Sequence, residues 1–279
     1  MTQVMGYSDI WSARPGDTVS FMVSCIGAAS YAAEIVRLKQ PEAGPLATPF
    51  APEPVDCPAN GVYEGREQAF PIGSLAVVPA HARFAELSAA TLAAYVMPTT
   101  PEKGRQALVG TWCEASQTGF GLEIDEAGGL SVRIGAGPGK VVTLSSGVPM
   151  RAWRWHLVAA SFDAAAGSLR LWQEPQAART FDPDRPVSRE ATGVPAGSGS
   201  SGPLTFAAWR NGETAGPSAW GGLAFTCHFN GRIDRPRLVG RALERGGIAE
   251  LMAACAPFGY RDDLVAAWDF ALDIAGDAI

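Results

Sequence analysis

Residues 119–135, GFGLEIDEAGGLSVRIG, hold two short runs in which apolar and polar side chains alternate. Apolar residues stand at every second position, with Glu123 between them in the first run and Arg133 between them in the second. A period of two is typical of an antiparallel strand with one buried face and one solvated face. The stretch therefore predicts a β-hairpin that carries Glu123 and Arg133 on its solvated face.

Strand-length runs of the same kind continue on both sides of this hairpin, each bounded by Gly, Pro, Asp or Ser. Many short strands at this spacing predict an all-β fold, an antiparallel β-sandwich or jelly roll. Residues 155–162 differ, because apolar residues occupy both faces of this run, so we expect a central strand that is covered on both sides. The predicted strands are 74–80, 91–97, 106–112, 119–125, 129–135, 140–146, 154–163, 168–173, 203–210 and 227–234.

Two boundaries organise the chain. Residues 1–80 are expected to form a small β-sandwich-like module, in which six prolines at 41–60 mark a connection rather than sheet. The main sandwich is expected at 81–275. Within it, 174–202 is polar and rich in Pro, Gly and Ser, which predicts a long loop. The apolar stripe of 241–254 predicts one short helix near the C-terminus.

The composition argues against several classes of partner. The formal net charge of −6 and the pI near 5.2 leave no basic surface for nucleic acid or anionic lipid. The N-terminus lacks the features of a signal peptide, and no run approaches the ~18 apolar residues that a membrane span needs, so we expect a cytoplasmic protein. Five widely spread cysteines form no CxxC pair, which predicts neither a disulfide framework nor a zinc site.

The sequence shows no convergent set of catalytic residues. Its three histidines stand at no spacing that would pair two metal ligands, and no GxSxG motif is present. The GAGPGK stretch at 135–140 precedes a strand rather than a helix, which favours a hairpin turn over a phosphate loop. Carboxylates at 125–126, 182–184 and 262–263 lie in or near predicted turns and leave calcium as an open alternative without forming a ligand loop. We therefore predict no catalytic residue and no metal ligand in this chain.

Eight tryptophans raise the question of sugar binding, although core packing is the commoner use of tryptophan. Trp172 is the best candidate for an exposed contact, because it lies opposite Leu169 and Leu171 on its strand and beside Arg170. The candidate ligand-binding residues are Trp172, Arg170 and Arg133. Burial of Trp172 against a neighbouring domain is an equally open alternative.

Two motifs carry a resemblance to LamG-type, concanavalin A-like jelly-roll domains. The first is WRWHLVAASFD at 153–163, which a Gly turn and a strand follow, and the second is NGRID at 230–234, which leads to a short helix. The likeness extends over about residues 84–270 and implies the sandwich fold. Pro236 and the insertion at 174–202 depart from the family pattern, so the resemblance leaves the edge strands and loops undefined.

A second resemblance reaches outside the jelly roll. The opening YSDIWSARPGDTVSFMVSC at 7–25 and the closing AAWDFALDI at 266–274 together resemble the N-terminal region of the large subunit of N,N-dimethylformamidase. This resemblance implies that the iron and the catalytic residues lie in a catalytic domain outside these 279 residues. It also implies that the partners are other domains or subunits of a larger bacterial hydrolase, and that this chain itself holds no cofactor.

These observations support two functional hypotheses. The first is a non-catalytic accessory or interaction module of an amidohydrolase subunit, with a homo-oligomer as an open alternative. By resemblance, its parent would hydrolyse a small amide such as an N-substituted formamide. The second is a carbohydrate-binding, lectin-like module with a glycan site built from exposed Trp and polar loop residues. An autonomous enzyme is disfavoured, because the chain displays no convergent acid, base or nucleophile.

Overall fold

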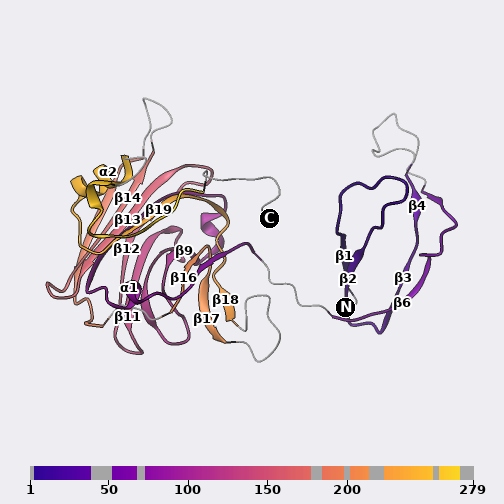
Figure 1. Cartoon of the computed structure of the whole chain (residues 1–279), viewed down its shortest axis with the longest axis horizontal. Coiled ribbons are helices and arrows are strands. Elements are labelled where there is room, and N and C mark those ends of the chain that lie inside the picture. Colours follow the sequence, from indigo (N-terminus) through magenta and orange to yellow (C-terminus); the bar gives the residue numbers. More distant parts are fainter. Residues whose placement is uncertain are drawn as a thin grey trace. The chain divides into compact units, whose positions relative to one another are not determined.

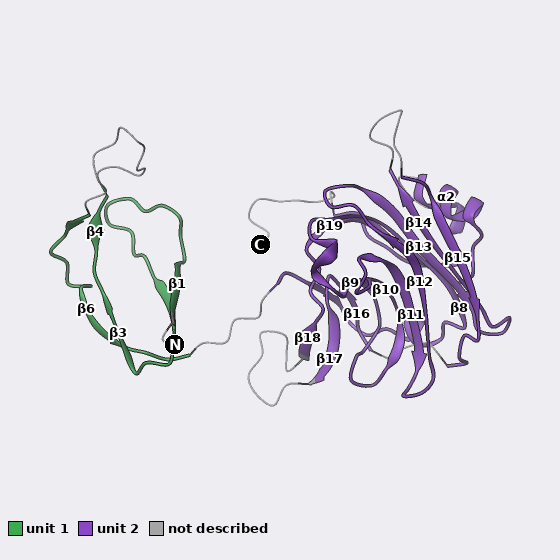
Figure 2. Ribbon diagram, turned by 180° about the vertical axis from the view of Figure 1, so that it is seen from behind, with its two compact units in different colours: residues 1–71 green, residues 72–279 purple. Residues whose placement is uncertain are grey.

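The computed structural model divides the chain into two compact units, unit 1 at residues 1–71 and unit 2 at residues 72–279 (Figure 2). Unit 2 is the larger and contains a two-layered sandwich, whereas unit 1 consists of short β ribbons. The residues that the structure describes are 3–38, 52–67, 73–176, 184–197, 202–213, 223–253 and 258–270.

Unit 2 is an antiparallel β-sandwich of two six-stranded sheets (Figure 1), which confirms the predicted fold class. Sheet 1 has the order β12-β11-β10-β9-β16-β7, and sheet 2 the order β15-β14-β13-β8-β19-β20. The strands of sheet 1 are β7 (Ala76–Val78), β9 (Gln106–Gly110), β10 (Thr118–Ile124), β11 (Gly129–Ala136), β12 (Val141–Pro149) and β16 (Leu204–Phe206). Those of sheet 2 are β8 (Ala89–Pro98), β13 (His156–Asp163), β14 (Ser168–Pro175), β15 (Val187–Thr192), β19 (Gly231–Val239) and β20 (Leu264–Ala267).

Shorter elements complete unit 2. Strands β17 (Trp209–Glu213) and β18 (Leu223–Thr226) form a hairpin beside sheet 1. A hydrogen bond from the Ala107 amide of β9 to the Cys227 carbonyl (2.8 Å) joins the end of this hairpin to the sheet. The helical elements are α1 (Ala82–Ala85), α2 (Arg245–Ala253) and two single 3₁₀ turns at Pro101–Lys103 and Phe258–Tyr260. Among the described residues, no helix has the length and apolar composition that a bilayer crossing requires.

The predicted hairpin forms from β10 and β11, where Phe120 pairs with Ile134 and Leu122 with Val132. Asp125 builds the turn, because its Oδ1 accepts hydrogen bonds from the Gly129 amide (2.9 Å) and from another amide of the turn. The paired apolar residues point to the same face, which packs against sheet 2. The two sheets meet in a continuous core, where the rings of Phe120 and Phe162 lie 5.3 Å apart.

The run at 155–162 confirms the expectation of a strand with two covered faces. Val158, Ala160 and Phe162 of β13 enter the core between the sheets. Leu157 and Ala159 point the other way, into a second apolar cluster beneath α2 (Figure 1). Such a strand is nearly continuous in apolar residues because it has no solvated side.

The predicted helix forms, but it begins at Arg245 rather than Arg241. Thr91 explains the late start: its hydroxyl donates to the Arg241 carbonyl (2.7 Å) and accepts from the Leu243 amide (2.8 Å). These two bonds hold 241–243 against β8, so the helix starts two residues later.

Two further segments differ from the sequence-based expectation. The loop expected at 174–202 contains β15, which pairs with β14; residues 177–183 and 198–201 lie outside the described part. β15 is a polar edge strand with mostly exposed or half-buried side chains, so its composition resembles that of a loop. Strand β7 pairs with β16 of sheet 1, which places it in unit 2, although the boundary expected at residue 80 assigns 74–80 to the N-terminal module.

Unit 1 contains three two-stranded sheets, which are β1 (Gln3–Ser8) with β2 (Phe21–Ile26), β3 (Ser30–Ala33) with β6 (Gly61–Glu64), and β4 (Val36–Arg37) with β5 (Glu53–Pro54). The predicted turn at 14–17 closes the first ribbon: the Asp17 amide donates to the Arg14 carbonyl (3.0 Å). Residues 41–51 of the proline-rich stretch lie outside the described part. Among the described residues of unit 1, only Ser24 and Cys25 are buried.

Candidate functional site

A buried charge cluster lies on the outer side of sheet 1 and contains Arg133, one of the sequence candidates. At its centre the carboxylate of Glu123 accepts hydrogen bonds from Arg133 Nη2 (3.0 Å), Arg105 Nη2 (2.7 Å) and Trp209 Nε1 (3.0 Å). Glu123 is only 1% exposed, so the prediction that it faces solvent is wrong. The reason is Trp209 at the start of β17, whose ring lies directly against Gly121 and covers this part of the sheet.

The charged groups of this cluster pair with one another, although the buried Arg105 Nε has no hydrogen-bond partner among the described residues. Burial alone would lower the pKa of Arg105, but hydrogen bonds to Glu123 and Glu114 outweigh it and raise that pKa above its ordinary value. Arg133 also lies over the ring of Trp112, 5.5 Å from its centre. The Glu123 carboxylate is thus held by two guanidinium groups and an indole. The cluster fits a structural role, and its guanidinium groups are already engaged.

The other two candidates, Trp172 and Arg170, lie on β14 in the opposite sheet. Trp172 is 6% exposed and packs beneath α2 with Leu157 and Leu251, so its predicted exposure is wrong. The helix covers the outer face of sheet 2, which the alternation along β14 could not reveal. Arg170 pairs with Glu190 (3.1 Å) and with Glu244. Since Arg133 belongs to sheet 1, the structure does not bring the three candidates together.

Two further ionisable groups of unit 2 are Asp184 and His156. Asp184 pairs with Arg151 (3.0 Å) and Arg154 (3.3 Å), while Asp182 lies outside the described residues. Burial lowers the pKa of His156 to about 4, which keeps this imidazole neutral at physiological pH. Within the described ranges, no group of three His, Cys, Asp or Glu residues could hold a metal ion.

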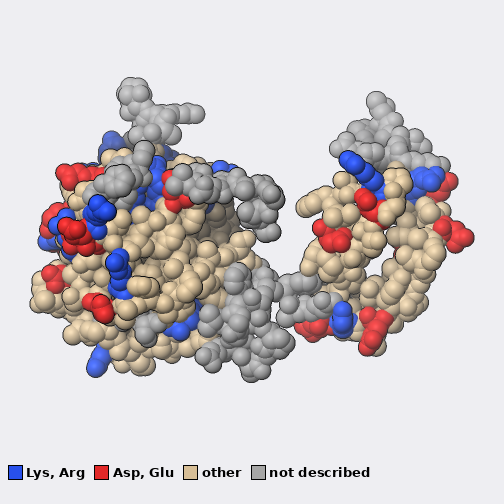
Figure 3. All heavy atoms as spheres, viewed as in Figure 1, with Lys and Arg blue, Asp and Glu red and all other residues tan. Residues whose placement is uncertain are grey.

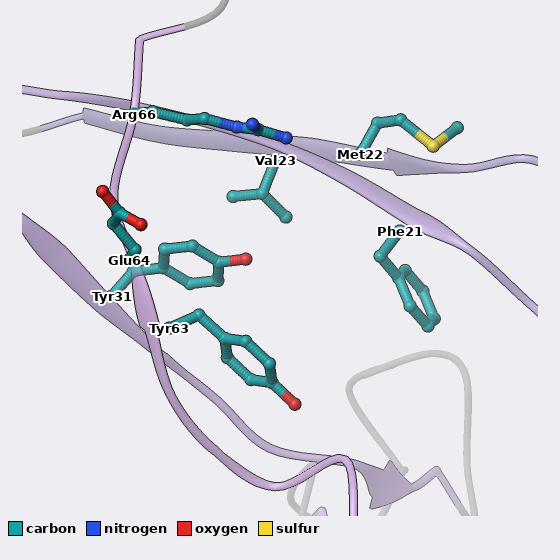
Figure 4. A pocket seen from close by; sticks show the side chains of 7 residues that line it. All are labelled: Phe21, Met22, Val23, Tyr31, Tyr63, Glu64 and Arg66. Carbon is teal, nitrogen blue, oxygen red and sulfur yellow. The ribbon is translucent and has the colours of Figure 1, made fainter.

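Unit 1 contains a feature of a different kind, two adjoining hollows of about 310 and 390 Å³. Both are lined by Phe21 and Val23 of β2, Tyr31 of β3 and Tyr63 of β6, and we call this feature the aromatic opening. Figure 4 shows Phe21 and Val23 pointing from β2 toward the two tyrosine rings, which approach from the other ribbon.

The two tyrosine rings form a preorganised apolar surface. Their rings stack with centres 5.7 Å apart and planes inclined by 22°, and the Tyr63 hydroxyl donates to the Ala59 carbonyl (2.6 Å). Aromatic rings fixed in this way present a large contact area with little conformational freedom to lose. Sequence reasoning missed this site, because the two tyrosines are 32 positions apart and neither run shows a chemical motif.

The border of the aromatic opening is charged. Glu64 and Arg66 line one hollow and Glu34 lines the other. Residues 1–71 carry eight acidic side chains against four basic ones, so unit 1 holds most of the acidic excess of the chain. Figure 3 shows unit 1 hollowed between its ribbons, with charged side chains around its border. Since Phe21, Val23 and the two tyrosine rings line both hollows, the arrangement is suited to binding apolar groups.

Residues 73–190 match the family model Laminin_G_3, described as the concanavalin A-like lectin/glucanases superfamily. The matched region begins before β7 and extends into β15, so it covers most of both sheets. Over these residues the sandwich is similar to concanavalin A-like domains. The match includes the motif at 153–163 and confirms the resemblance to LamG-type domains, whereas the motif at 230–234 lies outside the matched residues.

Two curated relatives match almost the whole chain, unit 1 included. The N,N-dimethylformamidase beta subunit of Paracoccus aminophilus is 32% identical over 288 residues, and that of Alcaligenes sp. is 28% identical over 296 residues. Each match covers 99% of this chain but only 37% and 36% of the relative. The chain therefore spans little more than a third of the length of these relatives, and its resemblance to N,N-dimethylformamidase is confirmed.

Solved structures overlap more loosely with this chain. A tailspike protein 2 of bacteriophage CBA120 is 15% identical, with a TM-score of 0.45, over 68% of this chain and 28% of its own. The carbohydrate-binding module CBM40 of a Ruminococcus gnavus sialidase, bound to sialyllactose, is 21% identical, with a TM-score of 0.40, over 58% of this chain and 82% of its own.

Proposed function

We propose that this chain is a non-catalytic accessory module of an N,N-dimethylformamidase-type hydrolase and corresponds to the N-terminal part of its β subunit. The observation that carries the proposal is the 32% identity with such a subunit over both units of the chain. A match that continues through unit 1 is more specific than a shared sandwich, because a fold alone does not give function.

In this proposal, the catalytic residues and the iron belong to the part of the enzyme that corresponds to the unmatched portion of the relatives. The charged residues of unit 2 support this division, since Glu123, Asp184 and Asp263 are each bound in ion pairs within the fold. The proposed substrate of the assembled enzyme is a small amide such as an N-substituted formamide. The partner is the catalytic portion, either joined to this chain or associated with it.

The carbohydrate-binding alternative lacks a comparable observation. It relies on an exposed Trp172 beside Arg170, but the ring is covered by α2 and the guanidinium is paired. The accessory role is therefore the one we carry forward.

The test compares three samples: this chain alone, the polypeptide of the same organism that corresponds to the unmatched part of the relatives, and the two joined or mixed. Hydrolysis of N,N-dimethylformamide and bound iron are measured in each sample. We expect both only where the catalytic portion is present, with full activity in the combined sample. Amide hydrolysis by the 279 residues alone would overturn the proposal, as would a source genome that encodes no such catalytic portion.

A further inference from the structure

Within unit 1, the described residues leave many large apolar side chains exposed. Val62 is 75% exposed, Phe21 64% and Tyr7 53%, and Trp11 is fully exposed. Of the described large apolar residues that are exposed, 11 lie in unit 1 and three in unit 2. A single two-stranded ribbon is marginally stable in water, and large exposed apolar patches rimmed by polar residues mark sites of interaction.

Three of the exposed apolar residues belong to the aromatic opening. Phe21 and Tyr63 line both hollows, and Ile35 lines one of them. Consecutive exposed residues on β1, Val4 and Met5, point to opposite faces of their ribbon, so both faces are apolar. A small ligand could fill the hollows, but it would leave this wider surface in water. A polypeptide segment can cover both.

We propose that the aromatic opening of unit 1 is a docking site for an extended apolar segment with flanking Lys or Arg residues, supplied by the catalytic portion of the enzyme. This inference rests on the proposed function, since the occupant belongs to the polypeptide that corresponds to the unmatched two thirds of the relatives. Aromatic side chains at the centre of such a contact carry most of the binding energy.

Charge favours a basic occupant. The opening has Glu34 and Glu64 in its lining against Arg66, and unit 1 as a whole is acidic. Complementary charges at the border of an apolar contact accelerate association and select against acidic competitors. A second copy of this chain would present the same acidic border, which disfavours self-association through this surface.

The experiment measures the affinity of the 279-residue chain for the separately produced catalytic portion, using isothermal titration calorimetry at low and high salt. Tyr63→Ser removes a ring from the opening, whereas the matched Tyr63→Phe retains the ring and removes only the hydroxyl. We expect Tyr63→Ser to weaken binding about 30-fold and Tyr63→Phe by less than about threefold, as for a central aromatic contact. Phe21→Ser should resemble Tyr63→Ser.

Two further variants show whether the loss of binding is specific to the aromatic opening and its charged border. Trp153→Asn changes an exposed aromatic residue of unit 2, at a position whose positive φ of 61° Asn tolerates, and should bind as the unaltered chain does. Glu64→Lys should weaken binding severalfold at low salt and lose that effect at high salt. Circular dichroism confirms that each variant retains the β content of the unaltered chain.

The outcomes distinguish this inference from the proposed function. If the two polypeptides assemble into an active enzyme but Tyr63→Ser and Phe21→Ser bind normally, the docking site is wrong and the accessory role stands. If the separate chain does not bind the catalytic portion, the docking site is wrong, and the activity of the joined polypeptide decides whether the accessory role stands. If light scattering shows a dimer of this chain that Tyr63→Ser dissolves, a second copy is the occupant and our assignment is overturned.

Discussion

Unit 2 and unit 1 use apolar residues in opposite ways. In unit 2, two six-stranded sheets and α2 enclose three apolar clusters, and residues such as Leu122 and Leu169 are fully buried. In unit 1, three ribbons of two strands bury only Ser24 and Cys25 among the described residues. The chain resembles its relatives along its whole length, but its two units differ in how they treat apolar residues: one buries them and the other exposes them. The sandwich buries its large apolar residues within the fold, whereas the small module leaves most of its described ones exposed.

The largest expected effect concerns the buried charge at the outer side of sheet 1. Glu123→Gln removes the carboxylate that neutralises Arg105 and Arg133, and loss of one partner from a buried pair costs about 4 kcal/mol of unfolding free energy. Urea denaturation of the sandwich measures it. The matched control is Glu126→Gln, an exposed position three residues away, where the change should stay within about 0.5 kcal/mol. Equal effects at the two positions would show that the Glu123 cluster contributes nothing special.

A matched pair of truncations compares the two units directly. Leu122→Ala leaves a cavity between the sheets and should lower the unfolding free energy by about 3 kcal/mol. Val62→Ala in unit 1 should change it by less than about 0.5 kcal/mol, because this side chain is 75% exposed. Thermal or urea unfolding of the two variants provides the measurement. A large loss from Val62→Ala would mean that unit 1 has a core of its own.

A pH series sharpens the same contrast. The pKa of His156 is about 4 in the fold against about 6.5 when unfolded, so the unfolded chain binds the extra proton between these values. The neutral imidazole of His156 therefore contributes fully to the unfolding free energy above pH 6.5. This contribution is lost as the pH falls toward 4, and the loss amounts to up to about 3 kcal/mol.

His156→Gln should remove this part of the pH dependence in urea titrations between pH 4 and 7. His81→Asn is the control: His81 is exposed and accepts from the Arg83 amide as the N-cap of α1, a role that Asn can also fill. Residues 1–71 contain no histidine, so the stability of unit 1 should show no histidine-linked pH dependence. An unchanged pH dependence in His156→Gln would contradict the assignment.

The alternation of apolar residues was sufficient to predict the sandwich, the β10–β11 hairpin and the doubly covered β13. It failed where the cover of a sheet comes from a distant segment. Glu123 and Trp172 both stand on faces that alternation marks as solvated, but Trp209 covers the first and α2 the second. Period-two patterns report which residues share a face and not what lies over it.

The aromatic opening could not have been predicted for a related reason. Tyr31 and Tyr63 meet only because β3 pairs with β6, which a long stretch of sequence separates from it. The sequence of neither strand predicts the register of that pairing. A usable signal was present in the composition: apolar residues at consecutive positions of a short strand, such as Val4 and Met5, are unusual for a ribbon that faces water on both sides.

Amide hydrogen exchange of the 279-residue chain, alone and with the catalytic portion, tests the central claim most directly, because protection reports local stability. We predict strong protection in β8, β10 and β13 of unit 2 in both samples. The amides of β1, β2, β3 and β6 should exchange rapidly in the chain alone and become protected on addition of the catalytic portion. Protection of unit 1 equal to that of the sandwich in the isolated chain, or no gain on addition, would contradict the account.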